Sequence, residues 1–265
     1  MYFHIFKIRC LTNLHVGSGD INYNVVDKEV EKDPVTGLPM IHASGIKGAL
    51  LQHFKDMDER EKNYIFGAPG KGDVSKPGAY RFLDAQLLAR PMRTERGSAS
   101  CINVTTEEML QNFLSTVEDF SGKKLGKKVP SLKFDLTKSN SENSKSVKFF
   151  ATSNVDVEGM ITQPLSDTQK SESAWVKKLI GENYAFVQNM EDYDLPIIAR
   201  NHLANGISTN LWYEEFVPHG SVFYMVVLTP EKDCKLVFSA PVQIGGNASI
   251  GCGFTKIEEI DLSTL

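Results

Sequence analysis

Hydrophobic and polar residues alternate at the start of the chain, in the stretch YFHIFKIRC. Phe6, Ile8 and Cys10 fall on one side of this stretch, and Lys7 and Arg9 fall on the other. A period of two is typical of a β-strand that has one buried face. The opposite face is then either a basic surface or an ordinary solvated one, and this strand alone does not decide between them.

A period of three to four residues predicts the helices. Apolar residues recur at this spacing over about 44–56, which indicates a helix with Ser44 as its N-cap. A more regular helical signal lies in NVTTEEMLQNFLSTV, where Thr105 and Glu108 have the spacing of a capping box. The stretch SAWVKKLI predicts a third, short helix.

Strand signals are most frequent in the second half of the chain. LPIIARNHLANGISTNLWYEEF predicts a hairpin around Asn205 and Gly206, and SVFYMVVL predicts a buried strand. Earlier, GAYRFLDAQLLARP predicts a strand followed by an irregular segment that Pro91 closes. GGNASIGCGF is a glycine-rich loop before a last strand, and it either accepts a polynucleotide backbone or forms a tight turn.

Length and composition set the class of protein. A chain of 265 residues with 41% hydrophobic residues predicts one large domain with insertions. The four cysteines are scattered without metal-ligand spacing, so we expect reduced thiols in a cytoplasmic protein. No stretch approaches the roughly 18 apolar residues of a membrane span, so no membrane partner is expected.

Charge limits where a nucleic acid could bind. The net charge of −4 argues mildly against a protein that coats itself with nucleic acid, so any such surface must be local. Residues 121–150 are rich in lysine, serine and asparagine, and they predict either a solvated insertion or an RNA-contacting arm. Dinucleotide, P-loop, serine-hydrolase and zincin motifs do not occur in the sequence.

The start of the helix predicted over 44–56 has unfavourable residues for a helix. Gly45 and Gly48 each cost about 1 kcal/mol relative to alanine, and Lys47 adds a positive charge where the helix dipole is already positive. Two interpretations remain open. Either the helix N-terminus and Lys47 bind a phosphate, or the glycines relieve packing against a strand while Lys47 points outward.

Five motifs, read in order, resemble one known family. They are LHVGSG, VVDKEVEKDPVTGLPMIHASGIKGAL, GAYRFLDAQLLARPMRTERG, LWYEEFVP and IGGNASIGCGF. Together they resemble the RAMP superfamily of CRISPR proteins, and within it the backbone subunits of type III-B Cmr effectors, with the type III-A Csm backbone subunits as near relatives. The resemblance covers most of the chain except about 120–190.

The resemblance implies an α+β fold: an RRM-like ferredoxin palm with inserted segments and a thumb β-hairpin, here at about 195–212, all in a single RAMP domain over 1–265. It implies a subunit that stacks head-to-tail with other copies along a CRISPR guide RNA, beside other type III effector subunits. Such a subunit cleaves complementary single-stranded target RNA at six-nucleotide intervals and uses Mg²⁺ or Mn²⁺.

The resemblance also implies roles for individual residues. The family's catalytic, cation-binding aspartate matches Asp27, with Asp20 and Asp33 as nearby rivals. Asp33 precedes Pro34 and is expected to form an Asx turn. His15 matches a family histidine that is either catalytic or RNA-binding. The predicted RNA-binding residues are Lys47, Ser44, Arg90, Arg93, Tyr213, Glu214, Gly245, Gly246, Gly251 and Gly253.

Two further hypotheses stay open at this point. The chain is alternatively a non-catalytic module that only holds guide RNA, or a stand-alone RAMP ribonuclease that processes guide RNA by metal-free histidine chemistry. The sequence also departs from the family pattern, because Gly45 replaces a serine and the hairpin lacks an arginine-rich start.

Overall fold

The computed structural model describes residues 1–17, 19, 25–68, 70, 76–97, 99–134 and 148–265, which form two compact units. The first unit contains Met1–Gln86, Asp194–His219 and Phe223–Ile260. The second contains Leu87–Tyr193, Gly220–Val222 and Asp261–Leu265. Asp20 and residues 135–147 of the lysine-rich segment 121–150 lie outside the described residues.

The sheet of the first unit is centred on the N-terminal strand. In spatial order its strands are β15 (Val242–Gln243), β16 (Phe254–Glu259), β1 (Tyr2–Cys10) and β14 (Val222–Thr229). β5 (Arg81–Phe82) pairs with β14, and β2 (Met40–Ile41) pairs with the start of β6 (Ala85–Arg96). The predicted alternation is confirmed, because Phe6, Ile8 and Cys10 are buried whereas Arg9 is exposed.

Two helices belong to the first unit. α1 (Ala43–His53) confirms the first predicted helix, but its N-cap is His42, and Ser44 lies inside the first turn. The His42 ring accepts the Ser44 N–H and so takes the role that the sequence assigned to the serine. α2 (Glu59–Phe66) was not predicted from the hydrophobic pattern, because it buries only Ile65 and Phe66. A short pair, β3 (Gly67–Ala68) and β4 (Lys76–Pro77), follows it.

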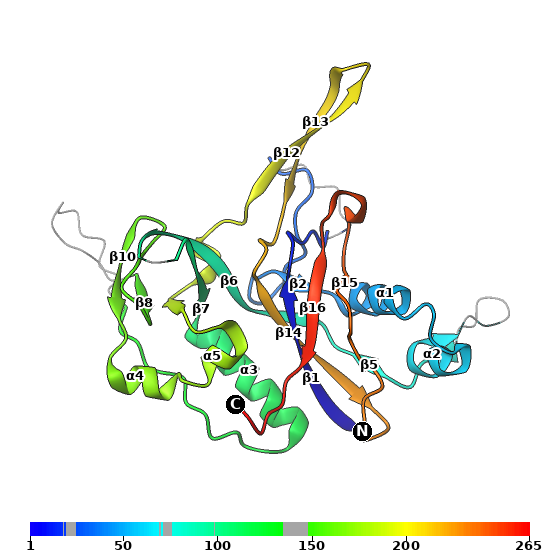
Figure 1. The fold of residues 1–265 in the computed structure, drawn as a ribbon, viewed down its shortest axis with the longest axis horizontal. Coiled ribbons are helices and arrows are strands. Elements are labelled where there is room, and N and C mark those ends of the chain that lie inside the picture. Colours follow the sequence, from blue (N-terminus) through cyan, green and yellow to red (C-terminus); the bar gives the residue numbers. More distant parts are fainter. Residues whose placement is uncertain (18, 20–24, 69, 71–75, 98, 135–147) are drawn as a thin grey trace. The chain divides into compact units, whose positions relative to one another are not determined.

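The hairpin predicted around Asn205 and Gly206 is confirmed in the first unit, and we call it the thumb hairpin. β12 (Ile197–Ala204) and β13 (Ile207–Glu215) pair antiparallel around Asn205 and Gly206, whose φ angles are 51° and 81°. Positive φ at both central residues favours an Asn-Gly turn. Most of both strands is exposed, and the hairpin extends away from the sheet of its own unit (Figure 1). Only the base of β13, at Glu214 and Glu215, is buried.

The strands of the second unit pair in a mixed, parallel and antiparallel arrangement. Its strand order is β6, β7 (Cys101–Thr105), β11 (Tyr184–Val187), β8 (Phe149–Ala151), β10 (Met160–Pro164) and β9 (Asp156–Val157). β9 also pairs with β6, which closes this order into a ring. β7 and β11 are parallel, as are β8 and β10. Mixed α and β structure is therefore confirmed in both units.

The sequence placed Pro91 at the end of an irregular segment, which is wrong. Pro91 lies inside β6, opposite Asn103 of β7. Thr94 N donates to Ser100 O, just before β7. The direction of the backbone N–H alternates along a strand, so the nitrogens of residues 90, 92 and 94 face β7. The nitrogen of Pro91 faces away from β7, where its missing N–H removes no bond of that ladder.

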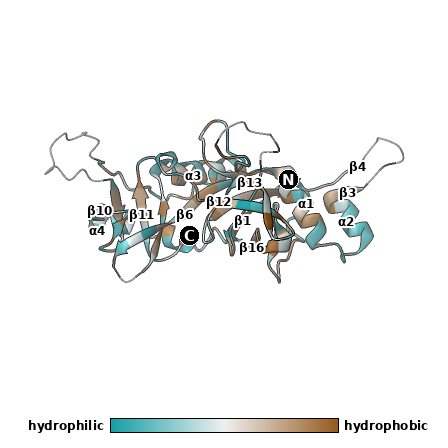
Figure 2. Cartoon of the chain, turned by 90° about the horizontal axis from the view of Figure 1, so that it is seen from above, coloured by the Kyte–Doolittle hydropathy of each residue, from teal (hydrophilic) through white to brown (hydrophobic). Residues whose placement is uncertain are grey.

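The helices of the second unit are α3 (Glu107–Ser121), α4 (Asp167–Glu172) and α5 (Val176–Ile180), with the 3-10 turn η1 (Met190–Asp192). α3 and α5 confirm predicted helices. The capping box predicted at Thr105 is wrong by one residue: Thr106 accepts the Met109 N–H, while Thr105 ends β7 and donates to Leu88 O. Figure 2 shows α4 as hydrophilic and β11 as hydrophobic, in agreement with their burial. No helix among the described residues is long and apolar enough to cross a bilayer.

Candidate functional site

Asp27 is fixed at the base of the thumb hairpin. Tyr213 N donates to its Oδ2 at 2.8 Å, and Asp27 N and Lys28 N both donate to Tyr213 O at 3.1 Å. Asp27 itself is exposed. Its backbone is therefore held firmly by β13 while its carboxylate lies at the surface, which suits a residue that acts on a bound molecule.

The loop that carries Asp27 is bound along its length to the end of β13. Glu215 N donates to Lys28 O at 2.9 Å, and the Glu215 carboxylate accepts from Val30 N at 3.0 Å and from the Lys32 ammonium at 3.2 Å. Glu215 is buried. Its two oxygens satisfy donors of the loop, so Glu215 has a structural role here.

Glu214 is the centre of a buried polar cluster. Oε1 accepts from Lys28 Nζ and from Trp212 Nε1, both at 2.8 Å. Oε2 accepts from Asn247 Nδ2 at 2.9 Å and lies 2.6 Å from Arg200 Nε. Burial acts to raise the pKa of Glu214, but the hydrogen bonds and charges of Lys28, Trp212 and Arg200 outweigh it and lower that pKa.

The contact of Glu214 with RNA stays a prediction that this geometry does not support. The Glu214 side chain is only 1% exposed, and four groups of the same chain surround its carboxylate. Two cations that pair with Glu214 are more accessible to a bound molecule. The Lys28 side chain is 52% exposed, and the Arg200 side chain is 24% exposed. Both cations also lie against aromatic rings, Lys28 over Trp212 and Arg200 over Phe216.

His15 is bonded to the end of β13, which also holds the Asp27 loop. Its Nδ1 lies 2.9 Å from Glu215 O, and a carbonyl only accepts, so Nδ1 carries a proton. The ring is 7% exposed and lies 5.4 Å from the Phe216 ring. A Cβ at Gly17 would lie 3.2 Å from Nε2, so the glycine leaves room for the second ring nitrogen.

The glycine-rich loop packs on His15 and on the Glu214 cluster. Gly246 N donates to His15 O at 2.8 Å, and a Cβ at Gly245 would lie 2.3 Å from that same oxygen. A Cβ at Gly253 would lie 2.0 Å from Ile244 O. Close approach of the chain to itself therefore requires Gly245 and Gly253. Gly251 has no heavy atom of the described residues near its Cβ position and keeps its predicted role.

α1 lies against β15, which leads into the glycine-rich loop. A Cβ at Gly45 or Gly48 would meet no heavy atom of the described residues within 4 Å, so these glycines do not relieve packing there. The face formed by Ser44, Gly45 and Gly48 is exposed. Two N–H groups of the first turn are already used, Ala43 N by Asp84 at 2.6 Å and Ser44 N by the His42 ring.

The remaining predicted residues divide into different environments. Tyr213 is exposed at the thumb base, and Arg93 is exposed in the second unit. Arg90 is 4% exposed, with its guanidinium donating to Met190 Sδ and Tyr193 O. Its contact with RNA stays a prediction that this geometry does not support, because the guanidinium is bonded inside the second unit.

The expected Asx turn at Asp33 is confirmed. Its Oδ1 accepts from Val35 N at 2.8 Å and from Thr36 N at 2.9 Å. Partial burial acts to raise the pKa of Asp33, but the hydrogen bonds from Thr36 and Val35 outweigh it and lower that pKa. Asp33 is thus occupied by its own turn, which leaves Asp27 as the better candidate of the two.

The RAMP superfamily matches residues 7–256 of the sequence. The chain belongs to the RAMP superfamily. The Cmr endoribonuclease Cmr4 of the CRISPR system of Pyrococcus furiosus is 26% identical to this RAMP protein over an alignment of 281 positions, which covers 96% of this chain and 94% of that protein.

Solved structures show the same RAMP fold. A chain of the type III-B Cmr-beta complex bound to cognate target RNA matches with a TM-score of 0.72 at 20% identity, covering 100% of this chain and 98% of that one. Oligomeric Cmr4 from Pyrococcus furiosus matches with a TM-score of 0.71 at 21% identity, covering 99% of each chain.

The sequence did not indicate three residues of this RAMP site, namely Lys28, Arg200 and Asn247. Lys28 directly follows Asp27, which was a usable signal. Arg200 and Asn247 lie far from residue 214 in the sequence, and only the folded chain brings all of them to one carboxylate.

The site offers little to a metal ion by itself. Among the described residues, no group of three or more His, Cys, Asp or Glu side chains is placed to hold one. Glu214 and Glu215 are buried and paired with cations. A divalent cation at this position would have Asp27 as its protein ligand and would need oxygen ligands from elsewhere.

Proposed function

We propose that this chain is a backbone subunit of a type III-B CRISPR effector, which binds guide RNA as a filament and cleaves complementary target RNA at six-nucleotide intervals. The observation that carries the proposal is Asp27, an exposed carboxylate whose backbone is fixed to the thumb base. The chain is also similar along nearly its whole length to a Cmr endoribonuclease. The first unit would be the RRM-like palm.

RNA cleavage of this kind needs a 2′-OH to lose its proton and attack the adjacent phosphate in line with the P–O5′ bond, which breaks and releases the 5′-oxygen. A nucleotide turned out of the stack can adopt that geometry. The thumb hairpin would hold such a nucleotide beside Asp27, because β13 is a strand of this hairpin and also binds the Asp27 backbone. Lys28 and Arg200 would bring positive charge to the phosphates there, with Glu214 fixing their direction. His15 is buried, so we propose that it positions the Asp27 loop through Glu215 instead of contacting RNA.

Asp27 would hold Mg²⁺ or Mn²⁺ together with phosphate oxygens of the RNA. Such a cation, when bound, neutralises charge that develops on the reacting phosphate. A single carboxylate binds a hard divalent ion weakly, so binding should require RNA.

Partners follow from the same proposal. The effector would contain guide RNA, target RNA, other effector subunits and further copies of this chain arranged head-to-tail, in the cytoplasm. The thumb supports this arrangement, because it exposes Leu203, Ile207 and Leu211 at 58%, 70% and 56%. Exposed apolar side chains in one projecting element are typical of a surface that another molecule covers.

The Asp27→Asn variant tests the proposed chemistry. Asparagine keeps the shape and can still accept the Tyr213 N–H, but it lacks the negative charge. We expect the variant to fold, to assemble with guide RNA and to bind target RNA, and to lose the six-nucleotide product ladder in Mg²⁺ or Mn²⁺. The readout is gel analysis of end-labelled target RNA with the reconstituted complex.

Asp33→Asn is the matched control, because it changes the same charge in the same loop region and should leave the ladder intact. A ladder of normal intensity from Asp27→Asn complexes would mean that another residue carries the chemistry. Failure of the wild-type complex to bind RNA would contradict the whole proposal. A ladder that persists in EDTA would favour metal-free cleavage.

A further inference from the structure

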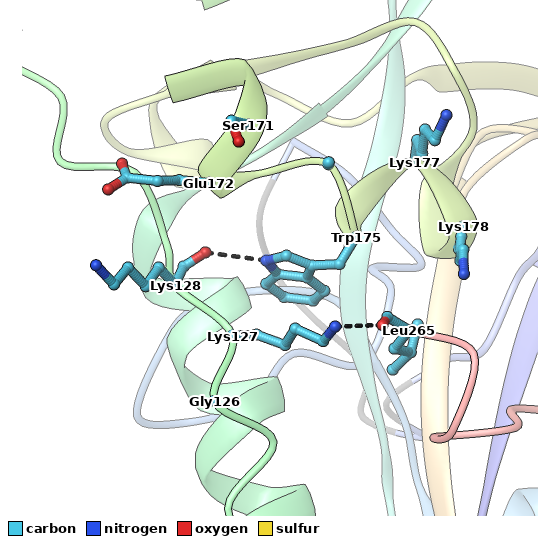
Figure 3. Close-up of a pocket in the computed structure, with 10 residues that line it drawn as sticks. Gly126, Lys127, Lys128, Ser171, Glu172, Trp175, Lys177, Lys178 and Leu265 are labelled. Carbon is cyan, nitrogen blue, oxygen red and sulfur yellow. Dashed lines mark hydrogen bonds between the residues drawn. The ribbon is translucent and has the colours of Figure 1, made fainter. Parts of the chain in front are cut away.

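The second unit contains a hollow with a lysine-rich rim. Its volume is about 410 Å³, and it lies between the segment that follows α3 and the helices α4 and α5. Lys127 and Lys128 border it on one side, and Lys177 and Lys178 border it on the other. Figure 3 shows Lys127 directed toward Leu265, with the other three lysine side chains pointing in different directions around the rim.

The backbone around the hollow is held by Trp175. The indole is 5% exposed, stacks on Phe113 of α3 at 6.1 Å, and donates from Nε1 to Lys128 O at 2.9 Å. Leu125 N donates to Glu118 Oε1 at 3.0 Å. These contacts join the segment that carries Lys127 and Lys128 to α3 and to the start of α5, so the four lysines project from a fixed framework.

The charge of this region is opposite to that of the whole chain. Residues 122–134 contain five lysines and no acidic residue, in a protein whose net charge is −4. Glu172 also lines the hollow, and Glu182 lies 3.6 Å from Lys177. The Lys177–Glu182 pair is exposed, and such pairs contribute about 0–1 kcal/mol, so an anion can compete with it.

One of the four lysines is already paired within the chain. The Lys127 ammonium donates to the main-chain oxygen of Leu265, which lies in the hollow. The remaining ammonium groups are spread around the rim instead of meeting at one point. This arrangement fits a chain of successive phosphates better than a single small anion.

We propose that this lysine-lined hollow is a second RNA-binding surface, which holds the phosphodiester backbone of single-stranded RNA without reading its bases. The inference rests on the proposed function, since it concerns RNA held by the same subunit. Protein partners usually dock through aromatic or aliphatic anchors in a hydrophobic centre. Here the one large aromatic side chain is buried, and lysines border the hollow, so RNA fits better than protein.

The test measures binding of the full chain to a long, fluorescently labelled single-stranded RNA in EDTA, over a series of salt concentrations. The test variant is Lys128→Glu/Lys178→Glu, because both side chains are exposed and neither supports the fold. The control variant is Lys55→Glu/Lys232→Glu, two exposed lysines of the first unit that give the same change in net charge.

We expect the test variant to bind RNA on the order of tenfold more weakly than the control. Its salt dependence should be shallower by about 1.4, because each phosphate contact of a single strand contributes about 0.7. Equal affinity and equal salt dependence of the two variants would overturn the inference. So would normal RNA binding combined with loss of a protein subunit from the reconstituted complex. If the wild type itself fails to bind RNA, the proposed function has failed instead.

Discussion

At the scale of single residues, Glu214 is the group on which the site depends most. One buried carboxylate accepts from Lys28, Trp212 and Asn247 and pairs with Arg200. These partners come from the Asp27 loop, from both thumb strands and from the glycine-rich loop. Removing the charge would leave two cations without their shared counterion, a costly change in a buried position.

Glu214→Gln should therefore lower the free energy of unfolding by about 1–3 kcal/mol at pH 7. Glu258→Gln is the control, since Glu258 pairs with Lys256 and Lys7 at the surface, where the loss should be about 0–1 kcal/mol. Urea unfolding followed by circular dichroism measures both. Equal small losses would mean that the cluster contributes no more than a surface pair.

The same residue gives a pH dependence. The folded-state pKa of Glu214 lies below its ordinary value of 4.5, so its contribution is complete above pH 4.5 and disappears as the pH falls through the folded-state pKa. Wild-type stability should then fall more steeply than that of Glu214→Gln between about pH 5 and pH 3. If the stability of the wild type and that of Glu214→Gln fell in parallel over this pH range, the assignment of a lowered pKa to Glu214 would be contradicted.

At the scale of elements, the thumb shows how register decides chemistry. Ala204 pairs with Ile207 beside the turn, but a bulge between His202 and Leu203 shifts the ladder, so Arg200 pairs with Trp212. Without the bulge Arg200 would stand opposite Leu211, and Trp212 and Glu214 would lie on the other face of the hairpin. The bulge is thus what places Arg200, Trp212 and Glu214 on one face.

In α1, the Gly48→Ala variant should raise stability and weaken RNA binding at the same time. Gly48 lies inside the helix, exposed, with open space around its Cβ position. Gly48→Ala should raise the free energy of unfolding by up to about 1 kcal/mol because alanine favours helix. If a guide-RNA phosphate rests on this face, the added methyl group and Lys47→Glu should each weaken guide-RNA binding.

Thermal melts and anisotropy titrations measure the two effects separately. Lys232→Glu, at an exposed lysine of the first unit, is the control, because it matches the charge change of Lys47→Glu and should leave guide-RNA affinity unchanged. A more stable Gly48→Ala protein with unchanged RNA affinity would remove α1 from the RNA-binding surface.

At the scale of the whole molecule, a subunit that stacks along RNA must use a heterologous, head-to-tail interface. Such an interface does not close on itself, so the number of copies should follow the length of the RNA. Light scattering of the protein with RNAs of increasing length should show increasing mass per particle. A dimer of fixed size at every RNA length would contradict the filament.

The sequence by itself determined the features that depend on neighbouring residues. The period of two in 2–10, the helices at α1, α3 and α5, and the Asn205-Gly206 turn follow from local patterns of hydrophobicity and φ preference. Five motifs in order also indicated the RAMP superfamily, which the match over residues 7–256 confirms. Errors at this level were small, such as one residue at the start of α3.

Tertiary structure alone decided which polar groups are available. Arg90 and Glu214 were predicted to contact RNA, yet both are buried and bonded within the chain. Lys28, Arg200 and Asn247 meet at one carboxylate although they are far apart in the sequence. Burial and pairing depend on contacts between distant segments and on a single bulge, and a local pattern of residues carries no record of either.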